Sequence, residues 1–504
     1  MKLEELLRGL STVKVRPGGS GEVVEICYDS RRARPRALFV AVPGTKSDGH
    51  DFVSRALEGG AAGAVVERES VFLELSIRYP DRHLVLVRDA RLALADLSAA
   101  LHARPSEHLA LIGITGTNGK TTTSFLVESI LRAAELSPGL VGTVSYRVGG
   151  QTLPSTHTTP ESVDLDDLLS RMLESGAESA VLEVSSHALA QHRVAGLEFD
   201  AVVFTNLTQD HLDFHKDLED YFQAKRRLFT SQLDRQKKKK NPACVINAGD
   251  PYGKRLLSEC RAAGRRVFSY ALEGDADLRP EKIFWDTAGI HGTIRTPAGT
   301  LEIRSHLVGE HNVLNILAAV GAGLSLEIPP AKIAAGIEEL ERVPGRLDPV
   351  PNKLGLSVLV DYAHSPDALE NALSAARKLS KGRVICVFGC GGDRDRTKRA
   401  PMARAVSRLS DLAVLTSDNP RTEDPLRILS DAREGLSGKE GEKFFVEADR
   451  RKAIVLAIDK AKSGDVVLIA GKGHEDYQII GTVKHHFDDR EESAAALAAR
   501  EKAR

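Results

Sequence analysis

Residues 112–123 read Ile-Gly-Ile-Thr-Gly-Thr-Asn-Gly-Lys-Thr-Thr-Thr, and this stretch decides the class of fold. An apolar run over 109–114 leads into it, and apolar residues at helical spacing, such as Phe125, Leu126 and Ile130, follow it. In a strand–loop–helix unit, glycines let backbone N–H groups close around phosphate oxygens, and the helix N-terminus adds its positive dipole end. The stretch therefore predicts a phosphate-binding loop at the end of a buried strand.

The same loop carries the side chains that a nucleotide needs. Lys120 is expected to neutralise the β- and γ-phosphates, and Thr121 is expected to hold Mg²⁺. The spacing departs from the strict GxxxxGK(S/T) pattern, because Ile114 stands where the first glycine belongs and glycines occur at 113, 116 and 119 instead. An ordinary glycine-rich turn is the alternative interpretation.

Composition limits the classes of protein that the chain can belong to. Its 504 residues suggest about three domains. The 69 Lys and Arg balance 70 Asp and Glu, so charge gives no support to nucleic-acid binding. We see no membrane span, no signal peptide and no zinc-type spacing among the five cysteines, and therefore expect a cytoplasmic enzyme with reduced thiols.

Two boundaries divide the chain into three predicted domains. Pro105 and the polar residues after it mark the first boundary, and Val343-Pro344-Gly345-Arg346 marks the second. We predict residues 1–106 as an α/β domain, 107–342 as a central phosphate-loop domain with a parallel sheet, and 343–504 as a doubly wound, Rossmann-like domain. The expected strands are 22–27, 37–42, 64–66 and 84–87, then 109–114, 180–184, 201–205 and 243–246, then 356–360, 384–388, 412–416 and 466–470.

Polar residues follow two strands of the predicted central sheet. Glu183 comes at the end of one strand, where a carboxylate can meet a Mg²⁺ held by Thr121. His211 follows the next strand and could ligate a second cation, although a lone histidine there is more often simply hydrogen-bonded. His215, four residues on, is the competing ligand.

Four polar loops follow strands of the predicted C-terminal sheet. They are 361–367, 389–396, 418–421 and 471–476. Because ligands of such sheets bind beyond the carboxyl ends of the strands, these loops are expected to share one site. Arginine pairs with carboxylate and an acidic side chain holds ammonium, so the set favours a zwitterionic ligand over ordinary turn chemistry. The loop at 389–396 lacks GxGxxG, so a NAD site is not favoured.

Lys225 lies in an amphipathic stretch, 221–229, that predicts a helix. By this pattern alone it would be a surface lysine whose stem lies along the helix.

Taken together and in order, these motifs closely resemble the Mur ligase family, along essentially the whole chain. The motifs are TGTNGKTT at 115–122, TTPE at 158–161, EVSSHAL at 183–189, DHLDFH at 210–215, AK at 224–225, HNVLN at 311–315, PGR at 344–346, DYAHSPDALE at 361–370, GCGGDRD at 389–395, DNPR at 418–421 and GKGHEDYQ at 471–478.

The resemblance implies an ATP site and a metal site between the central and C-terminal domains. Lys225 matches the family lysine that CO₂ carbamylates, which overturns the surface interpretation, and Lys120, Lys225 and Arg346 would be the catalytic residues. The implied ATP contacts are Gly116, Thr117, Asn118, Gly119, Lys120, Thr121, Thr122, Asn312, Asn315, Arg346 and Asp361. The implied metal ligands, for Mg²⁺, are Thr121, Glu183, His211 and carbamylated Lys225.

The resemblance also implies two further substrates. A UDP-N-acetylmuramoyl-dipeptide would bind the N-terminal and central domains, and an amino acid would bind the C-terminal one. The implied nucleotide–dipeptide contacts are Ser30, Thr45, Lys46, Ser47, Thr158, Thr159, Ser185, Gln191 and Arg193. The implied amino-acid contacts are Arg394, Asp418, Asn419, Pro420, Arg421, Gly471 and Glu475.

In this family DNPR accompanies meso-diaminopimelate, whose second carboxylate Arg421 would pair. The implied reaction joins that amine to a D-glutamate γ-carboxylate through an acyl phosphate, in peptidoglycan synthesis and hence in cell shape and division. We expect a monomer with small-molecule substrates. The alternatives are a lysine-adding relative, folylpolyglutamate synthase, and a nucleotide-dependent switch or binding protein.

Overall fold

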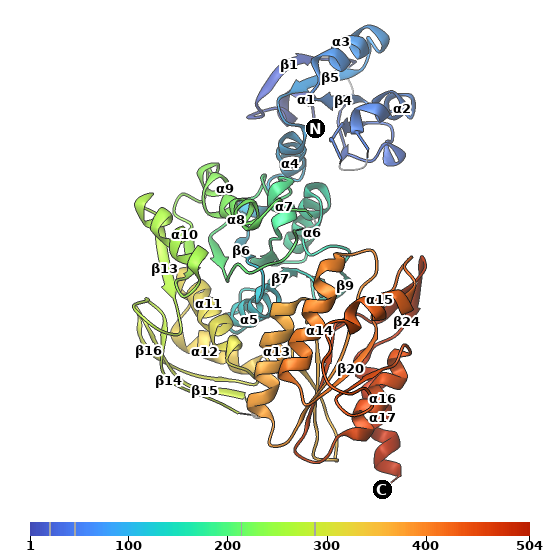
Figure 1. Cartoon of the computed structure of the whole chain (residues 1–504). Helices are drawn as coiled ribbons and strands as arrows, with labels where there is room; N and C mark the ends of the chain where they lie inside the picture. Colours follow the sequence, from blue (N-terminus) through green and yellow to red (C-terminus); the bar gives the residue numbers. More distant parts are fainter. Residues whose placement is uncertain (20–21, 45–46, 213, 287–288, 504) are drawn as a thin grey trace.

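A computed structural model describes residues 1–19, 22–44, 47–212, 214–286 and 289–503. The chain forms three α/β bodies (Figure 1). The N-terminal body, in blue, stands away from the other two, and the C-terminal body, in orange and red, lies against the central one.

The N-terminal body is built on a five-stranded sheet in the order β1-β5-β4-β3-β2. Its strands are β1 (Thr12–Arg16), β2 (Glu25–Cys27), β3 (Ala37–Val40), β4 (Gly63–Val66) and β5 (His83–Val87), and only β1 pairs antiparallel. Helices α1 (Leu3–Leu6), α2 (Val53–Glu58), α3 (Glu69–Arg78) and α4 (Ala90–Leu101) accompany it. Helix α4 also packs on α6 (Ser162–Glu174), which joins this body to the central one.

The central body has an eight-stranded sheet in the order β13-β12-β11-β6-β10-β7-β8-β9. Its strands are β6 (Ala110–Thr115), β7 (Pro138–Val141), β8 (Ser145–Val148), β9 (Gln151–Pro154), β10 (Ser179–Glu183), β11 (Ala201–Phe204), β12 (Ala243–Asn247) and β13 (Arg266–Tyr270). Strands β8 and β9 are antiparallel, and the rest pair in parallel. Because β6 lies between β10 and β11, the loop that follows it leaves the middle of the sheet.

Helices cover both faces of this sheet. One face packs on α5 (Lys120–Ala133), α11 (His311–Ser325) and α12 (Pro330–Glu339). The other packs on α6, α7 (Ser186–Ala190), α8 (Leu218–Arg226), α9 (Ser231–Asp234) and α10 (Pro251–Ala262). An antiparallel sheet of β14 (Arg279–Asp286), β15 (Gly289–Thr296) and β16 (Gly299–Ser305) lies against α12.

Helices α5 and α12 approach closely at Gly336. A Cβ atom placed on Gly336 would lie 2.4 Å from Cα of Ile130 and 2.8 Å from the carbonyl oxygen of Ser129. Only a residue without a side chain allows this approach, because the atoms in the way are backbone atoms of α5. The helix that begins at the phosphate loop is thus held by direct backbone packing.

The C-terminal body has a six-stranded sheet in the order β17-β18-β22-β19-β20-β21. Its strands are β17 (Asp348–Val350), β18 (Ser357–Asp361), β19 (Val384–Cys390), β20 (Leu412–Ser417), β21 (Phe444–Val446) and β22 (Val466–Ala470), and only β17 is antiparallel. Helices α13 (Pro366–Leu379), α14 (Arg399–Leu409) and α15 (Pro425–Arg433) cover one face, and α16 (Arg450–Lys460) and α17 (Asp489–Lys502) the other. A hairpin of β23 (Tyr477–Ile480) and β24 (Val483–His486) follows β22.

The predicted fold class is confirmed. Every predicted strand is present, with ends that differ by a few residues at most, and the domain boundaries near 106 and 342 stay predictions. All five cysteines are buried and free. In the part of the chain that the structure describes, no helix is long and apolar enough to cross a membrane.

Candidate active site

The loop between β6 and α5 has the shape of a phosphate cradle. Gly116 and Gly119 take φ values of +146° and +86°, where side chains are strained. A Cβ at Gly116 would lie 1.8 Å from the Thr205 hydroxyl, and one at Gly119 would lie 2.4 Å from the Asn315 side-chain oxygen. Both glycines are therefore required by the backbone conformation and by the close neighbours. Thr122 is buried in the first turn of α5.

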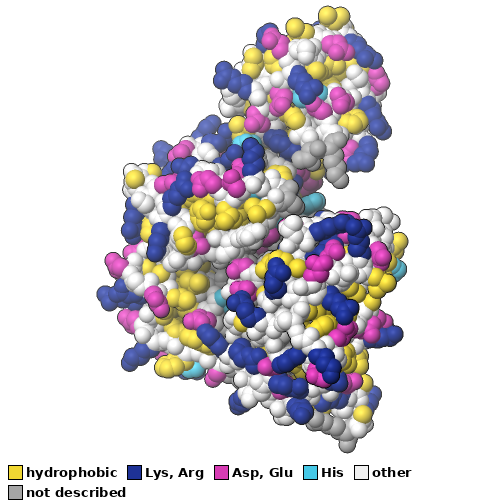
Figure 2. All heavy atoms as spheres, viewed as in Figure 1, with side chains coloured by type: hydrophobic (Ala, Val, Ile, Leu, Met, Phe, Trp, Pro, Cys, Tyr) yellow, Lys and Arg dark blue, Asp and Glu magenta, His cyan; other side chains and the backbone are white. Residues whose placement is uncertain are grey.

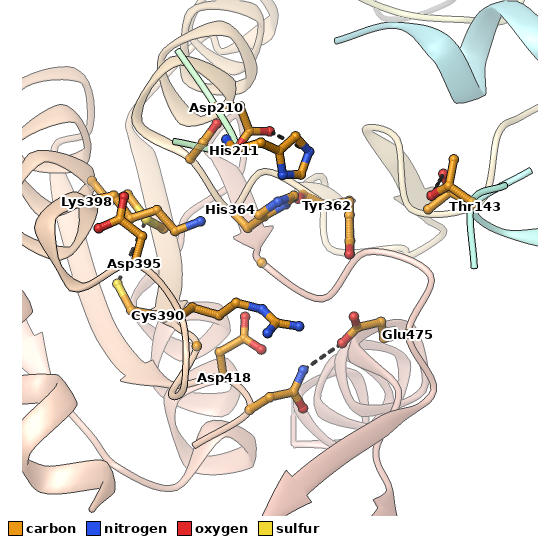
Figure 3. A pocket seen from close by; sticks show the side chains of 18 of the residues that line it. Thr143, Asp210, His211, Tyr362, His364, Cys390, Asp395, Lys398, Asp418 and Glu475 are labelled. Atoms are coloured by element: carbon orange, nitrogen blue, oxygen red, sulfur yellow. Dashed lines mark hydrogen bonds and ion pairs between the residues drawn. The ribbon is translucent and has the colours of Figure 1, made fainter. Parts of the chain in front are cut away.

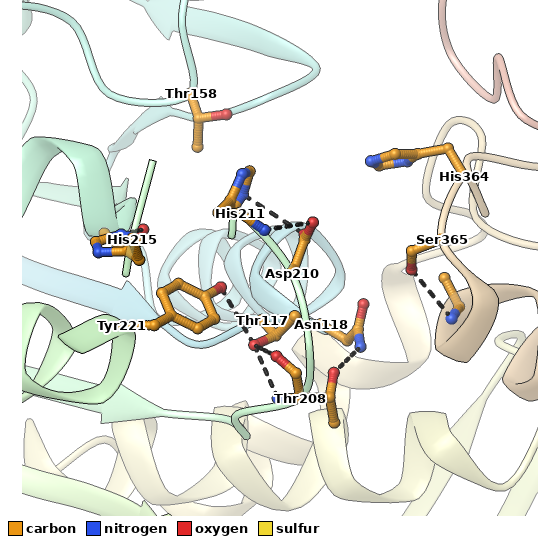
Figure 4. Close-up of polar contacts among 12 residues, drawn as sticks. Thr117, Asn118, Thr158, Thr208, Asp210, His211, His215, Tyr221, His364 and Ser365 are labelled. Carbon is orange, nitrogen blue, oxygen red and sulfur yellow. Dashed lines mark hydrogen bonds and ion pairs between the residues drawn. The ribbon is translucent and has the colours of Figure 1, made fainter. Parts of the chain in front are cut away.

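The loop after β11 holds this cradle in place. The Thr205 hydroxyl donates to the Asn118 carbonyl at 2.6 Å, and the Asn206 side-chain oxygen accepts from the Asn118 N–H at 2.9 Å. The Thr208 N–H donates to the Thr117 hydroxyl at 3.0 Å (Figure 4). The cradle is thus fixed before any ligand binds.

Lys120 folds back over the cradle. Its Nζ donates to the carbonyls of Gly116 and Thr117, each at 2.9 Å. Burial lowers the pKa of Lys120, and the nearby carboxylate of Glu183 partly opposes this shift. A phosphate group would offer the ammonium a stronger acceptor than two carbonyls do.

Glu183 is fully buried at the end of β10. Its Oε2 accepts from the hydroxyls of Thr121 at 3.1 Å and Thr143 at 2.9 Å, and its Oε1 accepts from the Thr143 N–H at 3.0 Å. These donors are neutral hydroxyl and N–H groups, and the Lys120 ammonium is a cation near them. This arrangement fits a bound cation, since Mg²⁺ prefers carboxylate and hydroxyl oxygens.

Lys225 is fully buried, which shows that the surface position suggested by its helical pattern was wrong. Its Nζ donates to the Gly116 carbonyl at 2.8 Å and lies 4.5 Å from the centre of the Tyr221 ring. Burial, and then the neighbouring charge of Lys120, holds the pKa of Lys225 well below its usual value. The neutral form of the amine is therefore favoured relative to that of an exposed lysine.

His211 lies at the rim of the same region, and its Nε2 is 3.5 Å from Asp210 Oδ2 (Figure 4). Burial lowers the pKa of His211 to about 4, so the ring is neutral at physiological pH, as a metal ligand must be. The competing residue, His215, is buried and its Nε2 bonds the Ser186 hydroxyl at 3.0 Å. Among the described residues, no three His, Cys, Asp or Glu side chains form a metal-binding group. Of the four predicted metal ligands, Thr121 and Glu183 are hydrogen-bonded to each other.

Arg346 reaches from the C-terminal body to the phosphate loop. Its Nη2 donates to the Thr121 hydroxyl at 3.3 Å, and its guanidinium carbon lies 5.1 Å from the centre of the Tyr362 ring. Asp361 accepts from the N–H groups of Leu347 at 2.7 Å and Ala363 at 2.8 Å, and burial raises its pKa. Asp361 therefore braces the turn that carries Arg346.

Asn312 and Asn315 lie in the first turns of α11, beside the phosphate loop. Asn315 Nδ2 donates to Asn312 Oδ1 at 2.9 Å, and Asn312 Nδ2 donates to the Val308 carbonyl at 2.8 Å. Both are buried. Their amides form one polar pair, and Asn315 lies next to Gly119.

Asp367, which the sequence analysis did not single out, connects the two bodies. Its Oδ2 accepts from Asn118 Nδ2 at 2.9 Å and from the Thr208 hydroxyl at 3.0 Å. The signal that could have found it is its place in the first turn of α13, two residues after the capping Ser365.

A cavity of about 1250 Å³ opens between the central and C-terminal bodies (Figure 3). Figure 2 shows the groove between these bodies from outside. The cavity brings together the predicted residues Thr158, His211, Arg394, Asp418, Asn419, Arg421, Gly471 and Glu475.

At one wall of the cavity a polar cluster surrounds Lys472, which the sequence analysis also missed. Lys472 is fully buried, and its Nζ donates to Asn419 Oδ1 at 3.1 Å and Glu475 Oε2 at 3.3 Å. Asn419 Nδ2 donates to Glu475 Oε2 at 2.8 Å, and Asp418 Oδ1 lies 3.9 Å from Lys472 Nζ. Gly471 donates its N–H to the Asp361 carbonyl. Burial raises the pKa of Glu475.

Arg421 and Arg394 also line the cavity, on neighbouring loops. Arg421 Nη1 donates to the Gly392 carbonyl at 2.8 Å, and Arg394 Nη1 donates to the Asp393 carbonyl at 3.2 Å. Pro420, the residue before Arg421, is buried just after the end of strand β20. Within the described ranges, no carboxylate lies within ion-pair distance of either guanidinium. The pair can therefore receive a carboxylate from a ligand.

The residues expected to contact the nucleotide–dipeptide lie in two places. Thr158 contacts Thr143, while Thr159 bonds Ser185 and accepts at its carbonyl from Arg193 at 2.8 Å. Gln191 Oε1 accepts from Arg193 at 3.0 Å.

On the N-terminal body, Ser30 is half-buried in a 3₁₀ turn and Ser47 is exposed. Among the described residues, neither serine bonds the group around Thr159 and Arg193. Thr45 and Lys46 lie outside the described residues.

Three family models match the chain in succession. They are described as Mur ligase family, catalytic domain, over residues 22–102, Mur ligase middle domain over 114–323, and Mur ligase, glutamate ligase domain, over 345–473.

Full-length relatives and solved structures agree with these models. The UDP-N-acetylmuramoyl-L-alanyl-D-glutamate–2,6-diaminopimelate ligases of Geobacter metallireducens and Gloeobacter violaceus are 47% and 48% identical, and each alignment covers 99% of this chain, with 98% and 99% of the relative. A solved structure of a ligase of that name is 32% identical, with 95% of each chain covered and a TM-score of 0.68. Folylpolyglutamate synthase from Mycobacterium tuberculosis shares the fold at 18% identity, covers 76% of this chain and 93% of its own, and has a TM-score of 0.62. On this evidence the chain belongs to the Mur ligase family.

Proposed function

We propose that the chain is the ATP-dependent ligase that adds meso-2,6-diaminopimelate to the D-glutamate γ-carboxylate of UDP-N-acetylmuramoyl-L-alanyl-D-glutamate. The observation that carries the choice of amino acid is the pair of unpaired guanidiniums, Arg394 and Arg421, in one cavity with the Asp418 and Glu475 carboxylates. The names of the full-length relatives support the same reaction. We place the enzyme in the cytoplasm, as a monomer, in peptidoglycan precursor synthesis.

The amino-acid pocket suits a ligand with charges at both ends. Diaminopimelate carries an ammonium and a carboxylate at each end, whereas lysine lacks the second carboxylate. Asp418 and Glu475 can hold an ammonium, and Arg421 can pair the far carboxylate bidentately. Lysine keeps the far ammonium but has no carboxylate beside it, so Arg421 would be left with its charge unpaired near a second cation, a penalty of several kcal/mol.

The reaction requires the two bodies to work together. The γ-phosphoryl group of ATP is transferred to the γ-carboxylate, which gives ADP and an acyl phosphate. The free amine of diaminopimelate attacks the acyl carbon, the tetrahedral intermediate expels phosphate, and the nitrogen loses a proton to give the amide. Lys120 and Arg346 lie where they can stabilise the negative charge on the transferred group, so catalysis is positioning and charge stabilisation.

Two groups would complete the site. Mg²⁺ bound by Thr121 and Glu183, with His211 and carbamylated Lys225 as further ligands, would neutralise phosphate charge. Glu183, buried among neutral donors, supports this assignment. Lys225, buried with a lowered pKa, can react with CO₂, because only a neutral amine attacks it.

The test is phosphate release by the purified protein with ATP, Mg²⁺ and UDP-N-acetylmuramoyl-L-alanyl-D-glutamate, with and without an added amino acid. We expect turnover with meso-diaminopimelate and little with L-lysine. Turnover with lysine alone would overturn the proposed role of Arg421, and ADP release without an amide product would point to a nucleotide-dependent switch. Turnover with a folate and glutamate instead would replace the proposal by folylpolyglutamate synthesis.

A further inference from the structure

Arg399 is one of the largest fully buried side chains in the described part of the chain. It begins α14, and its guanidinium extends beneath the cavity wall that carries the two unpaired arginines. Its Nη2 donates to Glu423 Oε1 at 2.9 Å, and its Nη1 donates to Asp431 Oδ2 at 2.8 Å. The same Nη2 lies 3.4 Å from the Gly391 carbonyl. Arg399 thus touches the loop before α14, the loop after β20, and α15.

Glu423 joins the two arginine-bearing loops directly. Its Oε1, besides accepting from Arg399, accepts from the Asp393 N–H at 2.6 Å. The Asp393 carboxylate in turn accepts from the Thr422 hydroxyl at 2.9 Å and the Thr422 N–H at 3.1 Å. Asp393 precedes Arg394, and Thr422 follows Arg421. These bonds therefore connect the loop that carries Arg394 to the loop that carries Arg421.

Both loops take a backbone conformation that needs such support. Asp393 has a φ of +52° and Arg421 has a φ of +54°, in the left-handed region that L-residues other than glycine rarely adopt. Surrounding contacts must hold a non-glycine residue there. The Glu423 carboxylate and the Thr422 bonds hold Asp393, which precedes Arg394. Arg421 is also held by the β23–β24 hairpin, since its N–H donates to the Ile479 carbonyl and its carbonyl accepts from the Gly481 N–H.

The charges around Glu423 keep it ionised. Arg399, which hydrogen-bonds it, and Arg396, whose Nη2 lies 2.9 Å from Glu423 Oε2, hold the pKa of Glu423 at about 2. The other acidic groups that face this cluster are Asp393 and Asp431. The connection between the loops is therefore a charged one at any pH at which the protein would work.

We infer that Arg399 and Glu423 are positioning residues for amino-acid selection, because they fix the separation of Arg394 and Arg421 that a ligand with a far carboxylate requires. The inference rests on the proposed function. Glu423 does not line the cavity among the described residues, and Arg399 borders it with only 1% of its surface exposed, so both act through the loops.

Three substitutions test the inference at different severity. Glu423→Gln keeps the shape and removes the charge, Arg399→Lys keeps the charge and loses the fork of donors, and Thr422→Val removes one hydroxyl without burying a charge. Arg433→Gln is the matched control, since Arg433 pairs with Glu440 on the exposed side of the same body. For each variant, kcat and KM are measured for meso-diaminopimelate, L-lysine and ATP, together with the unfolding temperature.

We expect Glu423→Gln to raise the KM for diaminopimelate roughly ten- to hundredfold, with the KM for ATP within about threefold of wild type. The preference for diaminopimelate over lysine should fall in proportion. Arg399→Lys and Thr422→Val should raise the KM for diaminopimelate less, and Arg433→Gln should have the wild-type KM values.

A purely structural role would move all three KM values and the unfolding temperature together, and that result would overturn the inference, as would an unchanged preference. Both of these results would leave the proposed function standing, provided that the wild-type enzyme turns over diaminopimelate. If the wild-type enzyme does not turn over diaminopimelate, both the proposed function and the inference about Arg399 and Glu423 are wrong.

Discussion

A buried lysine next to another lysine is costly unless it gives up its proton. Lys225 lies against the Gly116 carbonyl in the same region as Lys120, and no carboxylate contacts it among the described residues. A carbamate would turn this cost into a stabilising interaction, because it replaces a potential cation by an anion beside Lys120 and a bound Mg²⁺.

For Lys225→Ala we expect kcat to fall by roughly a hundredfold or more, as when one charge-stabilising group is removed from an active site. Lys225→Arg is the matched control, since it keeps a cation that cannot form a carbamate, and it should be equally impaired. ¹³C NMR with labelled bicarbonate should show a carbamate signal in wild type that Lys225→Ala lacks. A fully active alanine variant would contradict the assignment.

Glu423 gives the stability a defined dependence on pH. Its pKa in the folded protein is about 2, below the ordinary value of 4.5. A carboxylate whose folded pKa is depressed stabilises the fold above its unfolded pKa, and loses that contribution as the pH falls through the folded pKa.

Glu423→Gln should therefore be less stable than wild type at pH 7, and the difference should shrink as the pH falls from 4.5 towards 2. Urea unfolding midpoints at pH 7, 4 and 2.5 measure this. A difference that stays constant over that range would show that Glu423 is not held as an anion by Arg399.

At the scale of single residues, the sequence predicted the site residues that follow strand ends. It did not predict the roles of residues that depend on contacts with distant parts of the chain. Glu183, Asn419 and Glu475 follow apolar runs, so their place at the sheet edge can be predicted from the pattern. Lys472 and Asp367 lie in two of the polar loops, 471–476 and 361–367, but their partners cannot be assigned from the pattern, because one is buried against a neighbouring loop and the other contacts a different body. Lys225 had a signal, since it lies four residues after the buried Tyr221 on the same helix face.

Among elements, the packing of α5 on α12 determines where the phosphate loop lies. Since a Cβ at Gly336 would overlap backbone atoms of Ile130 and Ser129, the two helices must separate if any side chain is added. Helix α5 begins at Lys120, so a shift along it would be passed to the loop.

We expect Gly336→Ala to destabilise the protein by about 1–3 kcal/mol, despite the gain in helix propensity, and to raise the KM for ATP. Gly323→Ala in α11 is the control, because its Cβ would meet the flexible end of Ile333 at 3.0 Å. Thermal unfolding and ATP kinetics check both variants. Equal stability of the two would mean that the helices adjust without cost.

The elements that the sequence missed share a physical cause. Interior strands such as β6, β10 and β22 are buried on both faces and therefore appear as continuous apolar runs. Strands β1 and β14–β16 alternate or are largely polar, because one face meets solvent, and short edge strands such as β17 and β21 carry too few residues to show a period.

At the scale of the whole molecule, polar contacts join the described parts of the central and C-terminal bodies, among them an ion pair between Lys378 and Glu310. Asp367 accepts from both Asn118 and Thr208, and Arg346 donates to Thr121. These contacts join residues of the phosphate loop and its support to the C-terminal body, so we expect closure of the two bodies and nucleotide binding to be coupled.

Asp367→Ala should shift the protein towards a more open arrangement and lower kcat about tenfold, because a half-buried carboxylate that accepts two hydrogen bonds between the bodies is lost. Asp367→Asn keeps an acceptor oxygen and should stay close to wild type. Fluorescence energy transfer between dyes on the central and C-terminal bodies measures the opening. Identical transfer in wild type and Asp367→Ala would refute the role of this contact.

The burial of all five cysteines makes that measurement direct. Cys390 is the exception to watch, because it lines the cavity, whereas the other four do not border it. With Cys390 replaced by alanine, one cysteine introduced on each body becomes the attachment point there. Dye pairs can then be moved from position to position, and the distances between the three bodies can be followed through a complete catalytic cycle.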